Sequence, residues 1–295
     1  MKVKTKKLKP KNHLLFDQVI RLLVNEFSPM YIYHYATVEA KYHARSIFSD
    51  QDKRAQCTVH LLMITSGTEC LESKVQDYID RHAVGIKVII QVHGDEIVCR
   101  NLNSSNGYFT SVVNNGKLIY VEAGEFPYAP YQPPNPRKQL VREIARWHKR
   151  YENAKTFLSA GRQSIDNGTE NIGVFLLHQA TEQAIVGLIY VFMGYRSDIR
   201  NLSRLLHVCA CFSPQPLLHF TSATDHESLL RLMIRAFNRA RYEDEFSLEG
   251  HSGYQFLELV ENFLKLANGL CKESFSTKQK AIDQIALAKK EETNE

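Results

Sequence analysis

Four polar residues interrupt the most apolar stretch of the sequence, residues 173–194. His178 and Glu182 are four residues apart, and Gln179 and Gln183 have the same spacing. In a helix this spacing places each pair on one face, a turn apart. Imidazole and carboxylate groups can exchange protons, and a buried polar group without a hydrogen bond costs about 1–3 kcal/mol. The pattern predicts either a hydrogen-bonded network that fixes helix register, or the lining of a pocket or dimer contact.

A second chemically suggestive group is a run of arginines near residue 235. Arg231, Arg235 and Arg239 recur every four residues and are followed by Arg241. Guanidinium groups pair well with phosphate and carboxylate groups. Two interpretations stay open: a solvated face paired with acids at 243–245, or a surface that binds a phosphate or nucleotide and faces the N-terminal half. The predicted ligand-binding residues are His178, Glu182, Arg235, Arg239, Arg241 and Tyr242.

Composition sets wide limits. The 295 residues carry a formal net charge of +5, with 44% hydrophobic and 23% charged residues, which is typical of a globular protein. No apolar window of about 20 residues lacks polar interruption, so we expect no membrane span. The six cysteines are scattered without a CxxC pair and no signal peptide is visible, so we expect reduced thiols and a cytoplasmic location.

The N-terminal half alternates helix and strand signals. Strands are predicted near 30–36, 57–64 and 86–93, with a short strand at 117–121, and helices near 14–27 and 69–82. Such alternation is typical of a small α/β domain.

The C-terminal half reads as helical. It follows residues 126–136, where five prolines predict a semi-rigid, extended linker. Helices are expected at 137–165, 170–193, 198–212, 225–244 and 252–272, followed by a charged tail. Gly194 fits a helix stop and Asp198 an N-terminal cap.

The polar segment also resembles a known family. Leu177-His-Gln-Ala-x-Glu-x-Ala184, the later Gly194-Tyr195 and the run Arg241–Asp244 resemble the HEPN domain over roughly residues 137–272. The resemblance implies an antiparallel all-α bundle that forms a homodimer.

The N-terminal half resembles the minimal nucleotidyltransferase domain that accompanies HEPN. That family needs a Gly-Ser pair for the triphosphate and two carboxylates, one residue apart, for Mg²⁺. Here Ala36-Thr37 replaces the first, and Thr58 and His60 occupy the carboxylate positions. Neither residue supplies the negative charge that binds Mg²⁺. The resemblance therefore implies an inactive nucleotidyltransferase.

Two further activities, RNA cleavage and zinc binding, are not favoured by the sequence. HEPN ribonucleases carry an Arg and a later His with four to six residues between them. Arg241 occupies the arginine position, but the next histidine, His251, is ten residues away. A zinc site from His34, His60 and His93 would require all three to point to one face of the sheet. Ordinary half-buried strand histidines are the favoured interpretation.

Together these observations predict an α+β protein of two domains. Residues 1–125 form the nucleotidyltransferase-like α/β domain, 126–136 the linker, 137–275 an antiparallel HEPN helical bundle and 276–295 a charged tail. The expected function is non-catalytic binding or regulation, with a nucleotide or RNA as ligand. The alternative is a HEPN ribonuclease or divergent nucleotidyltransferase of toxin–antitoxin type. We expect no catalytic residue, metal or cofactor, and no membrane or DNA-specific contact.

Overall fold

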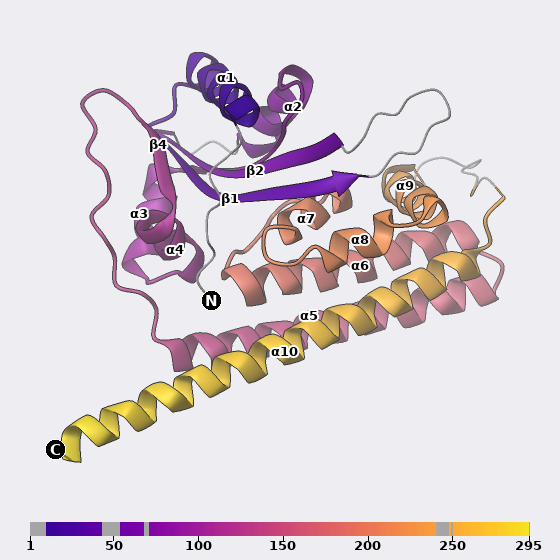
Figure 1. The fold of residues 1–295 in the computed structure, drawn as a ribbon. Helices are drawn as coiled ribbons and strands as arrows, with labels where there is room; N and C mark the ends of the chain where they lie inside the picture. Colours follow the sequence, from indigo (N-terminus) through magenta and orange to yellow (C-terminus); the bar gives the residue numbers. More distant parts are fainter. Residues whose placement is uncertain (1–9, 43–53, 68–70, 240–247, 249, 295) are drawn as a thin grey trace. The chain divides into compact units, whose positions relative to one another are not determined.

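The computed structural model describes residues 10–42, 54–67, 71–239, 248 and 250–294. The chain divides into two compact units, Met1–Pro134 and Asn135–Glu295, each described here by itself (Figure 1). The first is a mixed α/β unit and the second is helical, so the predicted fold class is confirmed.

The N-terminal unit is built on a four-stranded mixed sheet. Its elements are α1 (Pro10–Phe27), β1 (Tyr31–Tyr42), β2 (Arg54–Thr65), α2 (Glu72–His82), β3 (Lys87–Gly94), α3 (Asp95–Asn103), α4 (Gly107–Asn115) and β4 (Lys117–Val121). The strand order is β3-β2-β1-β4. β1 is antiparallel to both β2 and β4, and β2 is parallel to β3. All four predicted strands are present, and β1 and β2 are longer than predicted.

Helices cover both faces of this sheet. Alternate residues of β2, such as Val59 and Leu61, pack with α1 and α2 in the main apolar core. The other face meets α4, where the ring of Tyr108 lies 5.8 Å from that of Tyr35. Asn106 caps α4 by accepting hydrogen bonds from the backbone amides of residues 108 and 109.

The proline-rich segment is attached to the N-terminal unit. The side-chain amide of Asn114 exchanges two hydrogen bonds with the backbone of Tyr131, at 2.7 and 2.9 Å. The Tyr128 hydroxyl donates to Asp95, and the Tyr31 hydroxyl donates to the Phe126 carbonyl oxygen at 3.0 Å. Residues 126–131 are therefore held against this unit instead of forming a free spacer.

The C-terminal unit consists of helices only in its described residues. They are α5 (Pro136–Asp166), α6 (Glu170–Met193), α7 (Leu202–Cys209), α8 (Gln215–Thr221), α9 (Thr224–Arg239) and α10 (Gly253–Asn294). Asn135 caps α5, with Pro136 at its first position, and Gly194 ends α6 with φ of 70°. Three residues join α5 to α6, so the two helices pack as antiparallel neighbours (Figure 1).

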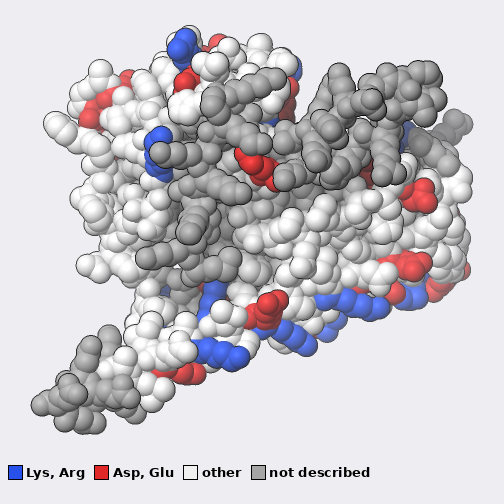
Figure 2. Space-filling view, viewed as in Figure 1, with Lys and Arg blue, Asp and Glu red and all other residues white. Residues whose placement is uncertain are grey.

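Three expectations for this half need correction. The helix expected at 198–212 begins at Leu202, because Asn201, not Asp198, caps it through the amide of Arg204. The short helix α8 was not predicted. Residues 276–294 were expected to form a separate tail, but they continue α10. Lys and Arg side chains, mixed with acids, gather along the edge that carries α10 (Figure 2).

The apolar helix α6 lies at the centre of the bundle and packs against α5, α7, α9 and α10. It approaches α5 closely at two glycines: an added Cβ atom would lie 2.5 Å from Ile165 at Gly173, and 2.9 Å from the Trp147 ring at Gly187. By length and composition α6 could cross a membrane, but 67% of its most apolar window is buried inside this unit. Burial in a helical core accounts for its apolar composition.

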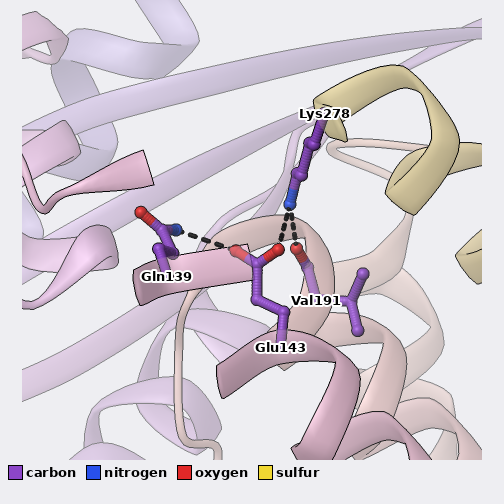
Figure 3. A network of polar contacts seen from close by, with 4 residues as sticks. All are labelled: Gln139, Glu143, Val191 and Lys278. Atoms are coloured by element: carbon purple, nitrogen blue, oxygen red, sulfur yellow. Dashed lines mark hydrogen bonds and ion pairs between the residues drawn. The ribbon is translucent and has the colours of Figure 1, made fainter. Parts of the chain in front are cut away.

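A buried ion pair joins α10 to the two preceding long helices (Figure 3). The Lys278 ammonium lies 2.6 Å from the carboxylate of Glu143, which is only 1% exposed. Lys278 also donates to the Val191 carbonyl oxygen at 2.7 Å, in the last turn of α6, and Gln139 donates to Glu143 at 2.8 Å. Lys278 thereby satisfies a carbonyl that the helix itself leaves unpaired.

Candidate functional site

The polar segment of α6 divides into a buried side and a half-exposed side. His178 is 1% exposed, and its ring stacks on that of Phe237 from α9, with centroids 4.4 Å apart. The Gln179 amide nitrogen lies 3.1 Å from His178 Nδ1, and a Glu182 oxygen lies 3.9 Å from it. His178 therefore belongs to the core and does not line an open site in this structure.

Glu182 and Gln183 lie on the half-exposed side, toward α5. Arg150 donates to the Gln183 side-chain oxygen at 2.5 Å. One turn earlier, the Arg146 guanidinium lies 5.3 Å from the centroid of the Tyr190 ring, a cation–π contact. The α5 arginines thus lie against the same helix that carries Glu182.

The pKa directions show that these charges act on one another. Burial raises the pKa of Glu182, although Arg200, Arg150 and a hydrogen bond from Gln179 act in the opposite direction. Burial lowers the pKa of Arg150; Arg146 adds to this by repulsion, and Glu182 opposes it. Arg200 lies in the exposed segment before α7. We call Arg146, Arg150 and Arg200 the arginine cluster.

Within the residues that the structure describes, the arginine cluster lacks matching negative charge. Across the described ranges, no carboxylate lies within ion-pair distance of these three arginines. Glu182 acts on two of them from farther away, and its side chain is only 17% exposed. Arg146 and Arg150 are half-buried and repel each other, and an anion beside them would relieve that repulsion; Arg200 is exposed. The arrangement suits a phosphate or carboxylate group.

The predicted arginines of α9 are only partly described. Arg235 is exposed, as is Arg231, which lies 3.7 Å from Glu227 of the preceding turn. The side chain of Arg239, together with Arg241 and Tyr242, lies outside the described residues. α9 does meet the polar segment of α6, but through Phe237 on His178.

The arginines that act on Glu182 were not among the residues predicted for the site. Arg142, Arg146 and Arg150 recur every four residues, which places them along one side of α5, and this spacing was readable from the sequence. Arg200 carries no such signal, because it lies in an irregular segment.

Comparison with known proteins identifies the helical unit. Residues 147–272 match the HEPN domain family. The C-terminal unit contains a HEPN domain. The match includes Arg150, Glu182 and Arg200, whereas Lys278 and the first turns of α5 lie outside it. Comparison with curated proteins gave no match.

A solved structure also resembles the chain. It is the crystal structure of a nucleotidyltransferase-like protein from Exiguobacterium sibiricum, with 15% sequence identity and a TM-score of 0.28. The alignment covers 87% of this chain and 78% of that one. Similarity at this level assigns no residue role or activity to the N-terminal unit.

Arg–His pairs at ribonuclease spacing do not converge in the HEPN unit. Arg142 and His148 are both exposed on α5, but six residues of helix turn the second about 120° away from the first. Arg200 and His207 have a similar spacing, but His207 Nδ1 lies 2.6 Å from the Ser203 carbonyl oxygen. That ring nitrogen is therefore engaged by its own helix.

In the N-terminal unit, Thr58 and His60, the two residues that the sequence resemblance placed at carboxylate positions, are buried. His60 is 0% exposed, and its ring lies 5.8 Å from that of Tyr35, which in turn contacts Tyr108 of α4. The Tyr35 hydroxyl donates to Gln91 of β3 at 2.6 Å.

The zinc arrangement fails for a geometric reason. His34 points to the opposite face of the sheet from His60, and its ring lies 5.3 Å from that of Phe16 in α1. Within the part of the chain that the structure describes, no three His, Cys, Asp or Glu residues form a metal-binding group.

Proposed function

We propose that the HEPN unit is a non-catalytic binding module for a phosphate-bearing ligand, either a nucleotide or RNA. The observation that carries the proposal is the arginine cluster beside Glu182, which among the described residues holds more positive than negative charge. Arginine pairs with phosphate through two parallel hydrogen bonds, and such charge-assisted bonds contribute about 1.5–3 kcal/mol.

Binding without cleavage is favoured by the placement of the histidines. His178 is covered by Phe237, and His207 is bonded to its own helix. A ribonuclease remains the second candidate because of Glu182, since a half-buried carboxylate with a raised pKa beside arginines suits acid–base chemistry. An RNA cleavage assay on the samples used for binding separates the two.

The test is a calorimetric titration of the full chain with ATP and, separately, with a short single-stranded RNA. Arg150→Ala and Arg200→Ala should each weaken binding about tenfold or more, the effect of losing about 1.4 kcal/mol. Arg162→Ala is the matched control, because Arg162 lies on the same helix but pairs with Glu261. Equal affinities for the Arg150 and Arg162 variants would overturn the proposal.

The site predicted on α9 stays a proposal of its own. Arg235→Ala, Arg239→Ala and Arg241→Ala test it in the same titration. A loss of affinity confined to these variants would move the ligand from α5 to α9. The homodimer expected from the HEPN resemblance also stays a prediction, which light scattering can check.

A further inference from the structure

The first part of α5 carries an excess of positive charge. Residues 137–150 contain six Lys and Arg residues and a single acid, Glu143. Glu143 is buried and pairs with Lys278, so it contributes no negative charge to the exposed face of these turns. The exposed face of this part of the helix is therefore cationic and carries no acid of its own.

Three of these cations form a stripe along the exposed face. Lys138, Arg142 and Lys149 are all exposed, and at about 100° per residue they lie within about 40° of one another around the helix. We call these three residues the α5 stripe, which extends about 17 Å along the helix axis. In the part of the chain that the structure describes, no carboxylate lies within ion-pair distance of any of them. The α5 stripe can therefore attract an anion from solution.

The placement of these charges does not stabilise the helix itself. Arg137 and Lys138 lie in the first turn of α5, which contains no acid. The N-terminal end of a helix carries a partial positive charge, so cations are unfavourable there and acids are the usual residues. An external anion along this face would offset that repulsion.

The length and the surroundings of the α5 stripe favour an extended polyanion over one small anion. The stripe is longer than a single phosphate group, and it leads to the arginine cluster, because Arg146 lies one turn beyond Arg142 on the same helix. On the side of the helix next to the stripe, Val141 and Ile144 are 67% and 43% exposed. The bases of an unpaired strand can cover such apolar side chains, whereas a duplex keeps its base faces stacked inside.

A membrane surface fits this face less well. A helix that lies in a membrane interface needs a broad apolar face toward the lipid. The apolar face of α5, which includes Leu140 and Trp147, is buried in the helical bundle. Val141 and Ile144 alone are too few to replace it.

We infer that the α5 stripe binds the phosphate backbone of an unpaired nucleic-acid strand, whose bases lie against Val141 and Ile144, and that the strand continues to the arginine cluster. The inference rests on the proposed function and narrows its ligand from any phosphate-bearing molecule to a strand. Every nucleotide carries the same phosphate, so binding through the stripe should show no base preference.

The test is fluorescence anisotropy of the full chain with one short single strand, made as RNA and as DNA, at several salt concentrations. Replacing Lys138, Arg142 and Lys149 by Ala together should weaken the binding of both strands about tenfold or more. The slope of log K against log salt should fall in magnitude by about 2, because each phosphate contact of a single strand contributes about 0.7. The affinity for ATP should change by less than about twofold, since one nucleotide does not extend along the stripe.

The matched control replaces Lys155, Arg162 and Lys265 by Ala. This variant loses the same number of Lys and Arg residues from exposed positions, and two of the three pair with acids. It should retain most of the strand affinity. Equal strand affinities of the two triple variants would overturn the inference, and so would a loss of ATP affinity as large as the loss of strand affinity. The proposed function would then still be decided by the Arg150 and Arg200 variants in the ATP titration.

Two further arms test the choice of partner. Annealing the strand to its complement should lower the affinity at least about threefold, because the bases no longer reach Val141 and Ile144. A duplex that binds as tightly as the single strand would overturn the inference. Binding to vesicles of anionic phospholipid without binding to the strand would assign the surface to a membrane and would also overturn it.

Discussion

Glu182 lies beside two arginines, and burial still raises its pKa above the ordinary value. The cost of removing its charge from water therefore exceeds the attraction of Arg200 and Arg150. Such a residue destabilises the folded protein when it is ionised, and a functional role would account for its presence there.

The first prediction at the residue scale concerns pH. Because the pKa of Glu182 is higher in the folded than in the unfolded state, its favourable contribution to stability is complete below the ordinary value of 4.5 and is lost as pH rises through the folded value. Glu182→Gln should thus melt roughly 2 °C higher than the natural chain at pH 7 and show no such gain at pH 4. Thermal melts across this range check it, and a gain that is equal at both pH values would contradict it.

At the residue scale, the sequence allowed some neighbours within the site to be predicted and others not. Helical spacing identified His178, Gln179 and Glu182 as neighbours, because residues four apart share a face. It could not identify Arg150 or Arg200 as neighbours of Glu182, since contacts between helices depend on tertiary packing. It also could not show that His178 is covered, because the ring over it belongs to Phe237, 59 positions later in the sequence.

At the scale of elements, α10 departs most from expectation. Its last part is rich in charged residues, which favoured a solvated tail. Among its described side chains, Ile282 is buried and Lys278 pairs with Glu143, and these two attach it to the unit. Two inward-facing positions among many charged residues give only a weak helical periodicity of apolar residues, so the packing of this part could not be predicted. The strands were easier to predict, because continuous apolar runs such as 57–64 mark buried strands.

Lys278→Ala should lower the free energy of unfolding by about 2–3 kcal/mol, because it leaves the Glu143 carboxylate buried without its partner. The estimate is below the range for fully buried pairs, since the Lys278 side chain is 35% exposed. Urea unfolding measures the change.

Lys280→Ala, on the same helix but exposed, is the matched control and should change stability by less than about 0.5 kcal/mol. Replacing both charged partners, in Glu143→Leu with Lys278→Met, should recover much of the loss. Equal stabilities of the Lys278 and Lys280 variants would contradict the role of the ion pair.

At the scale of the whole molecule, the docked proline-rich segment decides how the two units are joined. Hydrogen bonds hold residues 126–131 to the N-terminal unit, and the helical unit begins at Asn135. Residues 132–134 then form the connection between the two units, and the side chains that hold residues 126–131 make no hydrogen bond to them. The proline content predicted an extended linker, but composition could not show its contacts with Asn114 and Asp95.

Releasing this segment should expose it to protease. Asn114→Ala combined with Tyr128→Phe removes three of its hydrogen bonds, so chymotrypsin should cut after residue 128 or 131 several times faster than in the natural chain. Mass spectrometry of the fragments locates the cut. Asn115→Ala is the control, because Asn115 bonds only to Ser111 of its own helix. Equal cleavage rates in the double variant and this control would show that the segment is not held by these bonds.

Trp147 is the only tryptophan in the chain. Its ring packs against Gly187, and its indole nitrogen lies 3.3 Å from the side-chain oxygen of Asn268. Its emission therefore reports on the helical unit alone, while the tyrosines report on both units. A melt followed at the tryptophan and tyrosine wavelengths separates the unfolding of the two units without any label. Since Trp147 is the neighbour of Arg146 in the sequence, the same signal offers an optical readout of whatever binds at the arginine cluster.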